Sequence, residues 1–417
     1  MQIVTEIPDY IIDILTNTPN IGRRDLSANF NISESLARYY IKLWNERKED
    51  TSSKSIGLKH LLQDKVSKQA EEIKKLQSEL AKEDLVLDRL KSIIPELKLS
   101  NKIDKLKFSN KAYKEEREAL VTFADWHAGS VVNLQEMEGI NEYNMSIMAG
   151  RVWDLITGLV KIVETQRASF KIDTLNIFAL GDIVSGDIHR ELLVTNEEAI
   201  MQIVLETAYI MSQAIVFLTN HFNFIKVNCC AGNHGRTTQK PEFKKRVINN
   251  YDTLIYQITS LFLAKYIKEG IIQFKIPKSY EHIELIKGWS FLLGHGDSIK
   301  SWSGFPSYGM FRDNSNQQKI RKGKSLSNQD EIKGFDFRVM GHWHNFMVAD
   351  SGTTLVSPCL CGTDEYALNK MHVSSQPAQL LAFISERWGI KTVEQLFVRD
   401  RGHEFNIYKD GPIGECN

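Results

Sequence analysis

Side chains that could bind metal ions follow apolar segments at five places along this chain. The first segment, ALVTFADWHAG, runs from apolar and β-branched residues directly into Asp125 and His127. Four later segments have the same form: LNIFALGD ends in Asp182, IKVNCCAGNH ends in Asn233 and His234, FLLGHGD carries His295, and FRVMGHWH carries His342 and His344. The pattern is typical of buried strands, and sites in α/β sheets are built at the carboxyl ends of strands. We therefore expect these side chains to meet at one edge of a sheet.

The types and spacing of these side chains favour a pair of divalent metal ions. Carboxylate, amide and imidazole groups suit manganese, iron or zinc. In Asp125-x-His127 and His342-x-His344, alternate residues of an extended segment point the same way, so both can reach one cluster. Two metal ions about 3.5 to 4 Å apart can activate a water and stabilise the oxygens of a phosphoester displacement. We expect two divalent ions, manganese first, with iron, zinc or magnesium as alternatives.

A glycine stands directly before each of the four later ligand groups, at Gly181, Gly232, Gly294 and Gly341. Glycine is expected where a strand must turn sharply. The ordered set D-x-H, G-D-x-x, G-N-H, G-H and G-H-x-H resembles the signature of the calcineurin-like metallophosphoesterases and covers residues 118–395. The resemblance implies an α/β fold, a sandwich of two mixed sheets flanked by helices, with a dinuclear metal site at the sheet edges.

The resemblance also implies a role for each residue of the five segments. One metal ion would be held by Asp125, His127, Asp182 and His344, and the other by Asp182, Asn233, His295 and His342, with Asp182 as the bridge. His234 would contact the phosphate and protonate the leaving oxygen, and Asn233 would also face the substrate. Within the family, the chain looks most like DNA-repair exonuclease-type members and phosphoesterases of bacteriophage and prophage origin. That likeness implies a part in DNA replication, repair or processing.

Two positions depart from the family pattern. Gly235 follows the third motif where an acidic residue is usual, so the partner that would orient His234 is missing locally. Ser185 stands in the second motif where an acidic residue is frequent, and Asp187 or Glu191 could replace it in orienting a ligand histidine. Just past the third motif, Arg236 could clamp a phosphate through two hydrogen bonds, or could be a solvated arginine.

The composition is that of an ordinary soluble protein with more than one unit. The chain has 417 residues, 42% hydrophobic and 25% charged, and its formal net charge is zero, so no global charge attracts it to nucleic acid or to an anionic membrane. Five cysteines form no disulfide framework, which fits a reducing cytoplasm. We find no basic and apolar leader and no apolar run approaching the roughly 18 residues of a membrane span. We expect a cytoplasmic protein without membrane contact.

Residues 1–49 predict a helix-turn-helix module. Residues 24–30 form a short helix in this interpretation, Asn31 and Ile32 a turn, and Ser33 the N-cap of a second helix. The module resembles the helix-turn-helix of DNA-binding proteins, and its second helix would present Ser35, Arg38, Tyr39 and Lys42 to a major groove. A helical module that contacts protein is the alternative.

Residues 50–57 are predicted to be a linker and residues 58–98 a coiled-coil helix. From residue 62 to residue 94 a 3,4 spacing of mostly apolar residues forms a seam that Gln69 and Glu83 interrupt. The seam needs a partner, either a second copy of the chain or the surface of the catalytic domain. We expect a dimer or higher oligomer, which would pair the active sites. Residues 99–117 follow as a charged connector.

Residues 118–397 are predicted to be the catalytic domain and residues 398–417 a polar tail. Strands alternate with helical patterns at residues 143–167, 191–220 and 244–269, and the segments after His344 would form the second sheet. Residues 298–330 mix aromatic residues with lysines and arginines and show little periodicity. This segment is predicted to be a lid or substrate loop that stacks bases and pairs phosphates, or else a partly helical insertion.

These observations support three hypotheses of function. The first is a dinuclear-metal phosphodiesterase that hydrolyses DNA, that is, a nuclease with DNA as its partner. The second is a phosphatase or a phosphodiesterase of small nucleotides. The third is a catalytically weak, DNA-bound scaffold, for which Gly235 and Ser185 would mark lost catalysis.

Overall fold

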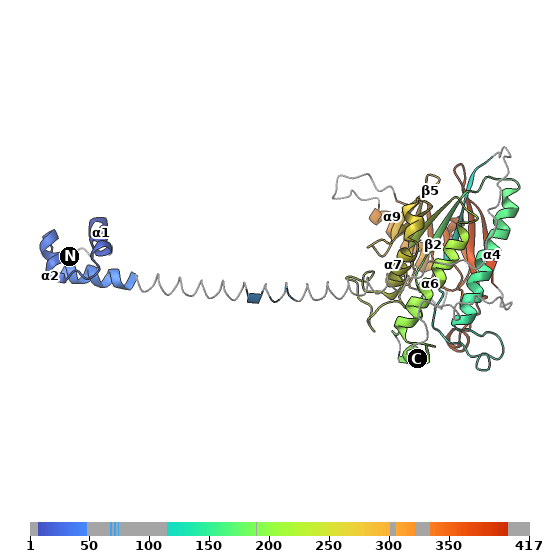
Figure 1. Ribbon diagram of the computed structural model, residues 1–417, viewed down its shortest axis with the longest axis horizontal. Coiled ribbons are helices and arrows are strands. Elements are labelled where there is room, and N and C mark those ends of the chain that lie inside the picture. Colours follow the sequence, from blue (N-terminus) through green and yellow to red (C-terminus); the bar gives the residue numbers. More distant parts are fainter. Residues whose placement is uncertain are drawn as a thin grey trace. The chain divides into compact units, whose positions relative to one another are not determined.

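The computed structural model describes residues 7–47, 67, 68, 71, 74, 115–188, 190–300, 306–321 and 334–398 (Figure 1). The chain divides into two compact units, Met1–Ile93 and Ile94–Asn417. Apart from four helical residues, the predicted coiled coil lies outside the described residues, as do the linker, most of the connector and the tail after residue 398. Self-association through the coiled coil therefore stays a prediction.

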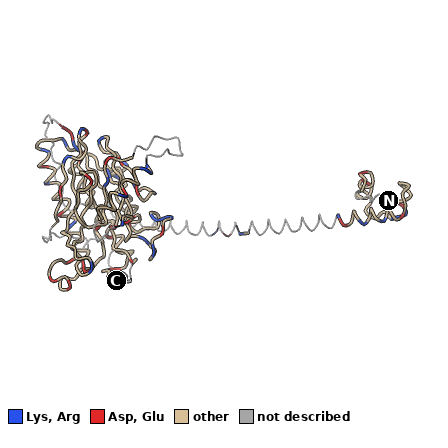
Figure 2. Tube along the Cα trace, turned by 180° about the vertical axis from the view of Figure 1, so that it is seen from behind, with Lys and Arg blue, Asp and Glu red and all other residues tan. Residues whose placement is uncertain are grey.

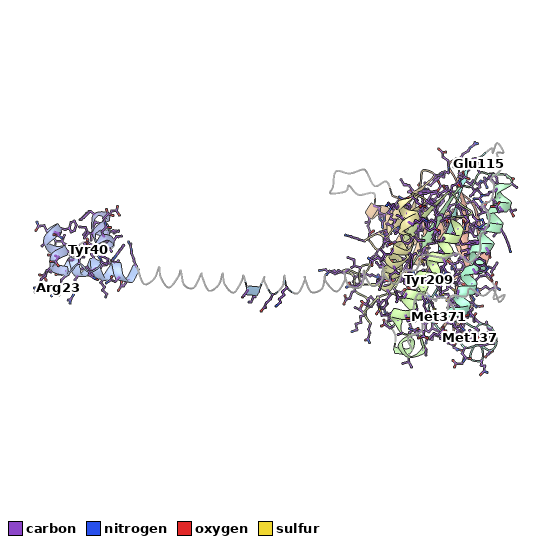
Figure 3. The ribbon with its side chains drawn as sticks, in the orientation of Figure 1. Arg23, Tyr40, Glu115, Met137, Tyr209 and Met371 are labelled. Carbon is purple, nitrogen blue, oxygen red and sulfur yellow. The ribbon has the colours of Figure 1, made fainter. Side chains whose placement is uncertain are left out.

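The first unit contains helices packed around a small apolar cluster. Helix α1 (Asp9–Asn17) and helix α2 (Arg23–Phe30) are followed by helical residues 34–47. Helix α2 ends at Asn31, whose φ of 53° is left-handed, and the Ser33 hydroxyl accepts a hydrogen bond from the Leu36 amide at 3.3 Å. The buried residues are Ile7, Ile11, Leu15, Leu26, Ala37 and Tyr40, of which Tyr40 is labelled in Figure 3. These contacts fix the helices, whereas binding of DNA by this unit stays a prediction.

The first sheet of the second unit is mixed and has the strand order β11-β10-β1-β2-β3-β4. Its strands are β1 (Arg117–Phe123), β2 (Thr174–Ala179), β3 (Phe224–Cys229), β4 (Ile272–Lys275), β10 (Ala378–Ser385) and β11 (Gly389–Phe397). Strands β1 to β4 are parallel, and β10 is antiparallel to both β1 and β11. The prediction that the chain after His344 forms only the second sheet is wrong for β10 and β11. Both faces of β10 are buried, which fits an inner position beside β1.

The second sheet is also mixed and has the order β5-β6-β7-β9-β8. Its strands are β5 (His282–Ile286), β6 (Trp289–Gly294), β7 (Phe337–Met340), β8 (Met347–Ala349) and β9 (Thr354–Val356). One apolar cluster joins the two sheets, with Leu120 and Phe178 from the first and Phe291, Val339 and Leu355 from the second. Two mixed sheets with helices confirm the predicted α/β class, and burial between the sheets brings the ends of β1, β2, β6 and β7 together.

Three helices lie side by side along the second unit (Figure 1): α4 (Met145–Arg167), α6 (Ile200–Leu218) and α7 (Tyr251–Phe262). The predicted helix over residues 191–220 is interrupted, since α5 (Arg190–Thr195) ends before α6 begins. The helix predicted from residue 244 begins at Tyr251, because the Asn250 side chain caps it by accepting from the Asp252 amide. Helix α8 (Ala264–Lys268) follows.

Helix α6 requires a correction to the predicted absence of long apolar segments. Among the described residues it alone is long and apolar enough to cross a membrane by length and composition, and 67% of that stretch is buried inside the unit. It packs against α4 and α7, as a core helix does. Along the described parts of the chain, Lys and Arg positions are interspersed with Asp and Glu positions (Figure 2), in keeping with the zero net charge.

The segment predicted as a lid or substrate loop contains helix α9 (Ser307–Arg321). Buried Arg338 of β7 anchors the helix, because it donates to Asp313 at 2.6 Å and to Asn314 at 2.9 Å. Met310 packs in an apolar cluster with Ile299, and Tyr308 is exposed. The remaining short elements are η1 (Asp350–Gly352) and η2 (Ala367–Met371). A role of α9 in substrate binding stays a prediction.

Candidate metal centre

The loops after β1 and β2 continue to pair beyond the ends of their strands. The Asp125 amide donates to Gly181 O at 3.1 Å, and the His127 amide donates to Asp182 O at 3.0 Å. The loop after β3 then packs directly on the loop after β2, because a Cβ atom at Gly181 would lie 2.3 Å from the Gly232 amide nitrogen. This contact requires glycine, and it places Asp182 between the first and third segments.

One group of potential ligands gathers around His127. Its Nε2 atom lies 3.1 Å from Nε2 of His344, and the latter lies 3.6 Å from a carboxylate oxygen of Asp125. Ligand atoms of Asp125, His127 and Asp182 all lie within 4.8 Å of one another. Asp125 also accepts from the His342 amide at 3.0 Å, which fixes the fifth segment against the first.

A second group gathers around His295. Its Nε2 atom lies 2.9 Å from Asp182 Oδ2 and 3.1 Å from Asn233 Oδ1, while its Nδ1 atom donates to Leu180 O at 2.8 Å. Ligand atoms of Asp182, His295 and His342 lie within 4.8 Å of one another. The structure thus brings together all seven predicted metal ligands, and Asp182 belongs to both groups. That these side chains bind metal stays a prediction.

Five of these ligand residues have left-handed backbone conformations, with positive φ angles of 52° at Asp125, 48° at His127, 49° at Asp182, 71° at His342 and 55° at His344. Such conformations cost residues other than glycine about 1 to 3 kcal/mol each, and they persist only where the surrounding structure imposes them. Here the turn after each strand imposes them. The strained backbone conformations therefore occur at the residues whose side chains converge.

Burial and charge set the protonation of the cluster. Burial alone would lower the pKa of His295, but the Asp182 carboxylate raises it to about 10. Burial would raise the pKa of Asp182, but the positive charges of His295 and His234 hold it well below its usual range. Burial lowers the pKa of His342 to about 4, and the charge of His295 acts in the same direction. The buried carboxylate of Asp182 is therefore ionised and ready to accept a cation.

The donor set fits hard or borderline divalent cations. Two carboxylates, one amide oxygen and four imidazoles are the groups that manganese, iron and zinc accept. Asp125, Asp182 and His295 are at most 1% exposed, whereas Asn233, His342 and His344 are partly exposed. Ions held here would have protein on one side and an open side from which a substrate approaches.

His234 lies at the same place with its ring edge-on to His127, 4.7 Å between ring centroids. Its amide donates to Asp182 Oδ1 at 2.7 Å, and its Nδ1 atom lies 2.9 Å from Ser185 O. A carbonyl only accepts, so Nδ1 carries the hydrogen, and Nε2 is the atom that can exchange a proton with a substrate. The backbone of Ser185 orients this histidine, so the side chain of residue 185 need not be acidic.

The sequence analysis missed Asp252, which holds the centre together from helix α7. Its fully buried carboxylate accepts from the amides of Asp182 at 2.9 Å, Ile183 at 3.1 Å, Val184 at 3.3 Å and Gly232 at 2.8 Å. Burial and the charge of Asp182 raise its pKa to about 7, and its bonds to the amides of Gly232 and Val184 oppose this rise. That Asp187 or Glu191 orients a ligand histidine stays a prediction. The only sequence signal for Asp252 was an acidic residue in the first turn of a helix.

Arg236 orders its own loop. Its guanidinium donates to Thr238 O at 2.9 Å, Asn233 O at 3.0 Å and Gln239 O at 3.1 Å. These bonds use three of the N–H groups of the guanidinium. The predicted contact between Arg236 and substrate stays a prediction, and the observed role is to fix the loop that carries Asn233.

The predicted DNA-binding residues lie in the other unit. Ser35, Arg38, Tyr39 and Lys42 are all exposed and share one side of the helix over residues 34–47, opposite buried Ala37 and Tyr40. Lys42 forms an exposed ion pair with Glu46 at 3.8 Å. The structure brings these four side chains to one surface but does not test their binding to DNA.

No family model matches the sequence, and no curated protein matches it. Several solved structures are similar in fold. Vps29 complexed with zinc from Entamoeba histolytica is 9% identical, covers 67% of this chain and 99% of its own, and has a TM-score of 0.27. A conserved uncharacterised protein, a predicted phosphoesterase, from Streptococcus pneumoniae is 10% identical over 68% of this chain and 98% of its own, with a TM-score of 0.23. Because these scores are low, the fold described here rests on the strand order and helices of the chain itself.

Proposed function

We propose that this chain is a metallophosphoesterase that uses two divalent ions to hydrolyse phosphodiester bonds of DNA. The observation that carries the proposal is the position of Asp182, whose carboxylate lies in both ligand groups, with His127 on one side and His295 on the other. A carboxylate shared by two groups of imidazole and oxygen ligands is the arrangement that a dinuclear centre needs.

The chemistry divides between the ions and the residues of the chain. Two bound ions would supply an activated water and would stabilise charge on the phosphoryl oxygens. Asp125, His127, Asp182, Asn233, His295, His342 and His344 would hold them. His234, held through Nδ1 by Ser185 O, would present Nε2 to the leaving oxygen and give it a proton. The buried side of the cluster keeps these groups in fixed positions, which is how enzymes of this type accelerate a displacement.

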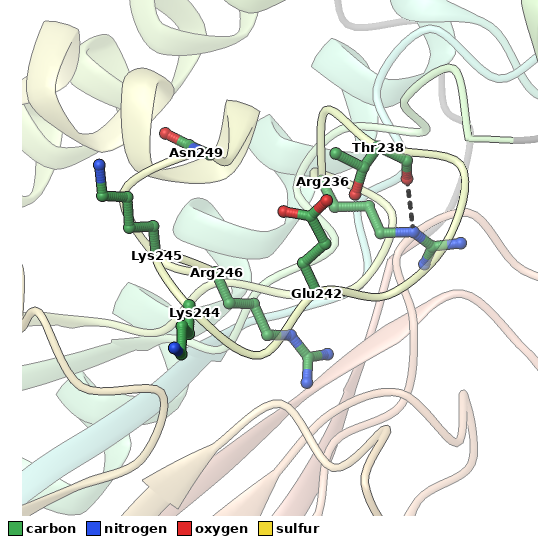
Figure 4. Close-up of a pocket in the computed structure, with 7 residues that line it drawn as sticks. All are labelled: Arg236, Thr238, Glu242, Lys244, Lys245, Arg246 and Asn249. Carbon is green, nitrogen blue, oxygen red and sulfur yellow. Dashed lines mark hydrogen bonds between the residues drawn. The ribbon is translucent and has the colours of Figure 1, made fainter.

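A basic surface on residues 236–249 supports DNA as the substrate (Figure 4). A pocket there is lined by Arg236, Thr238, Glu242, Lys244, Lys245, Arg246 and Asn249. Lys240, Lys244 and Lys245 are exposed and have no carboxylate partner within 4.0 Å among the described residues. Phe243, between them, is 89% exposed. Cations that attract phosphates, beside an aromatic ring on which a base can stack, favour a nucleic acid.

This surface is joined to the candidate centre at both ends. At one end Arg236 donates to Asn233 O, and at the other Arg246 pairs with Asp297, two residues after His295. DNA bound along the surface would therefore have its backbone near the partly exposed ligands. We include in the proposal that the exposed side of the helix over residues 34–47 contacts DNA as well, and that the chain self-associates through the coiled coil.

The test offers the purified full chain, with manganese, four substrates: plasmid, single-stranded DNA, bis-p-nitrophenyl phosphate and p-nitrophenyl phosphate. We expect cleavage of DNA and of the diester, lost in His295→Ala and kept in His372→Ala, which changes an exposed histidine outside the centre. Turnover of the small esters without DNA cleavage would instead indicate a phosphatase or small-nucleotide phosphodiesterase. Binding of DNA without any turnover would indicate a scaffold.

A second experiment tests the substrate surface by itself. Changing Lys240, Lys244 and Lys245 together to Gln should lower DNA cleavage. It should also make the slope of log binding constant against log salt concentration shallower, by about 0.7 to 0.9 for each phosphate that a lysine no longer neutralises. Turnover of bis-p-nitrophenyl phosphate should stay unchanged. The matched control changes Lys161, Lys265 and Lys268, three exposed lysines of α4 and α8, to Gln. Equal effects of the two triple variants would contradict a role for the surface.

A further inference from the structure

A cysteine that belongs to none of the five segments lies beside the first ligand group. The chain after β9 passes along the centre, and the Leu360 amide donates to Asp125 O at 3.0 Å. The Cys361 sulfur and the ring nitrogens of His127 and His344 all lie within 4.8 Å of one another. Cys361 is buried, with 4% of its surface exposed. The thiol is therefore close enough to bind the same metal ion as the two histidines.

The backbone at Cys361 is held by a buried arginine. Arg151 of helix α4 is 1% exposed, and its guanidinium donates to Leu360 O at 3.0 Å and to Cys361 O at 2.7 Å. The same guanidinium donates to Asn141 Oδ1 at 2.9 Å, and Asn141 in turn donates to Cys361 O at 3.0 Å. Taking a guanidinium out of water costs several kcal/mol unless its hydrogen bonds are replaced. Here the replacement bonds fix the position of Cys361 against the histidines.

The thiol makes only weak hydrogen bonds within the protein, one of them with the Cys359 side chain. Its Sγ atom lies 3.5 Å from Gly362 O, at the length of a weak S–H contact. Cys359 makes a similar contact with the same carbonyl at 3.6 Å and also a side-chain hydrogen bond with His344. Among the described residues, however, it is the Cys361 sulfur that completes a ligand group with both His127 and His344. The hydrogen bond with Cys359 and burial raise the pKa of the Cys361 thiol well above its usual value, so only a bound cation would favour the thiolate. The two cysteines thus form a natural pair for comparison.

We propose that Cys361 is a thiolate ligand of the metal ion that His127 and His344 hold. The inference rests on the proposed dinuclear centre and adds a sulfur ligand to only one of its two positions. Cys361 would release its proton when the metal binds, and the sulfur would then bond to the metal. Thiolate favours zinc or iron over manganese and magnesium, whereas the position at His295 keeps oxygen and nitrogen ligands. The two positions would accordingly differ in their metal preference.

Cobalt substitution tests the proposal without an activity measurement. Cobalt bound to a thiolate shows a sulfur-to-metal charge-transfer absorption in the near ultraviolet, in addition to the visible bands that report bound cobalt. We expect this absorption in the wild-type chain and in Cys359→Ser, and its loss in Cys361→Ser, which should still show the visible bands. Retention of the absorption in Cys361→Ser, or visible bands without the charge-transfer absorption in the wild-type chain, would overturn the proposal.

Two further measurements keep the proposal testable if Cys361→Ser fails to fold or if the metal centre fails to form. X-ray absorption of the zinc-loaded wild-type chain should show a Zn–S distance of about 2.3 Å and needs no variant. Zinc affinity should fall at least about 10-fold in Cys361→Ser, the loss typical of removing even an outer contact of a metal site. A chain that binds neither cobalt nor zinc contradicts the proposed function as well, whereas metal bound without sulfur contradicts the Cys361 ligand alone.

Discussion

The carboxylate of Asp252 occupies the space beside Gly235. A Cβ atom at residue 235 would lie 2.9 Å from Cγ of Asp252 and 2.3 Å from Oδ1 of Asn250, the residue that caps helix α7. An acidic residue 17 positions later along the chain thus fills the space beside the third motif and bonds to the amides around Asp182. The packing around Asn250 and Asp252 therefore gives a structural reason for glycine at this position.

Asp252→Asn should weaken metal binding. Both carboxylate oxygens accept two amides each, and an asparagine leaves one of these pairs facing an NH₂ group that cannot accept. By analogy with other groups that position metal ligands, metal affinity should fall about 10- to 100-fold. Titration calorimetry with manganese measures the change. Unchanged affinity would contradict the positioning role of Asp252.

Restoring the acidic residue by Gly235→Asp should destabilise the chain and add no activity. The new Cβ atom would overpack against Asn250, and overpacking of a buried site costs about 1 to 3 kcal/mol. Thermal unfolding should show a lower Tm than in Thr237→Ala, an exposed neighbour that serves as the control. A variant that is as stable as the wild-type chain and more active would show that the centre lacks an acidic residue at position 235.

His234→Asn should separate substrates by their leaving groups. A DNA oxygen leaves as a strong base and needs a proton, whereas p-nitrophenolate does not. Loss of the proton donor should lower kcat on DNA by about 10²- to 10⁴-fold and lower kcat on bis-p-nitrophenyl phosphate much less. Metal content should stay unchanged, since His234 is not a predicted ligand. Equal losses on both substrates would assign His234 to binding and not to proton transfer.

The metal-free chain should lose stability as the pH rises toward 10. The pKa of His295 is raised to about 10 in the folded chain, against 6.5 in the unfolded one, so its ion pair with Asp182 stabilises fully below pH 6.5 and is lost through pH 10. In EDTA the Tm should therefore fall between pH 7 and pH 10, and His295→Gln should flatten that fall. Because a metal must displace this proton, manganese binding should tighten over the same range. A Tm that rises with pH would contradict the ion pair.

The ligands of this centre could be predicted from the sequence because strands and their polar ends are local patterns. Asp125 and His127 follow one apolar run, and each of the other segments repeats the same order. Residues that hold the ligands in place could not be predicted. Asp252 and Arg151 sit on helices, far from the ligands in sequence, and their roles arise only when loops from four strands pack against those helices.

Two features of the fold could not be decided from the sequence, for a similar reason. The sequence predicts strands after His344, but only the pairing of β10 with β1 and of β11 with β10 assigns them to the first sheet. Helix α9 has polar and apolar residues without a clear helical period, yet Arg338 anchors it through Asp313 and Asn314. Contacts between segments distant in sequence determine the sheet assignment of these strands and the position of α9, and the local sequence pattern does not encode such contacts.

The most direct test is to count and locate the metal ions in the manganese-loaded chain. Elemental analysis should give two ions per chain for the wild type, and a crystal structure with anomalous scattering should place them about 3.5 to 4 Å apart on either side of Asp182. Asp182→Asn should lower the content of both positions. No metal at saturation, or ions bound away from Asp182, would contradict the proposed centre.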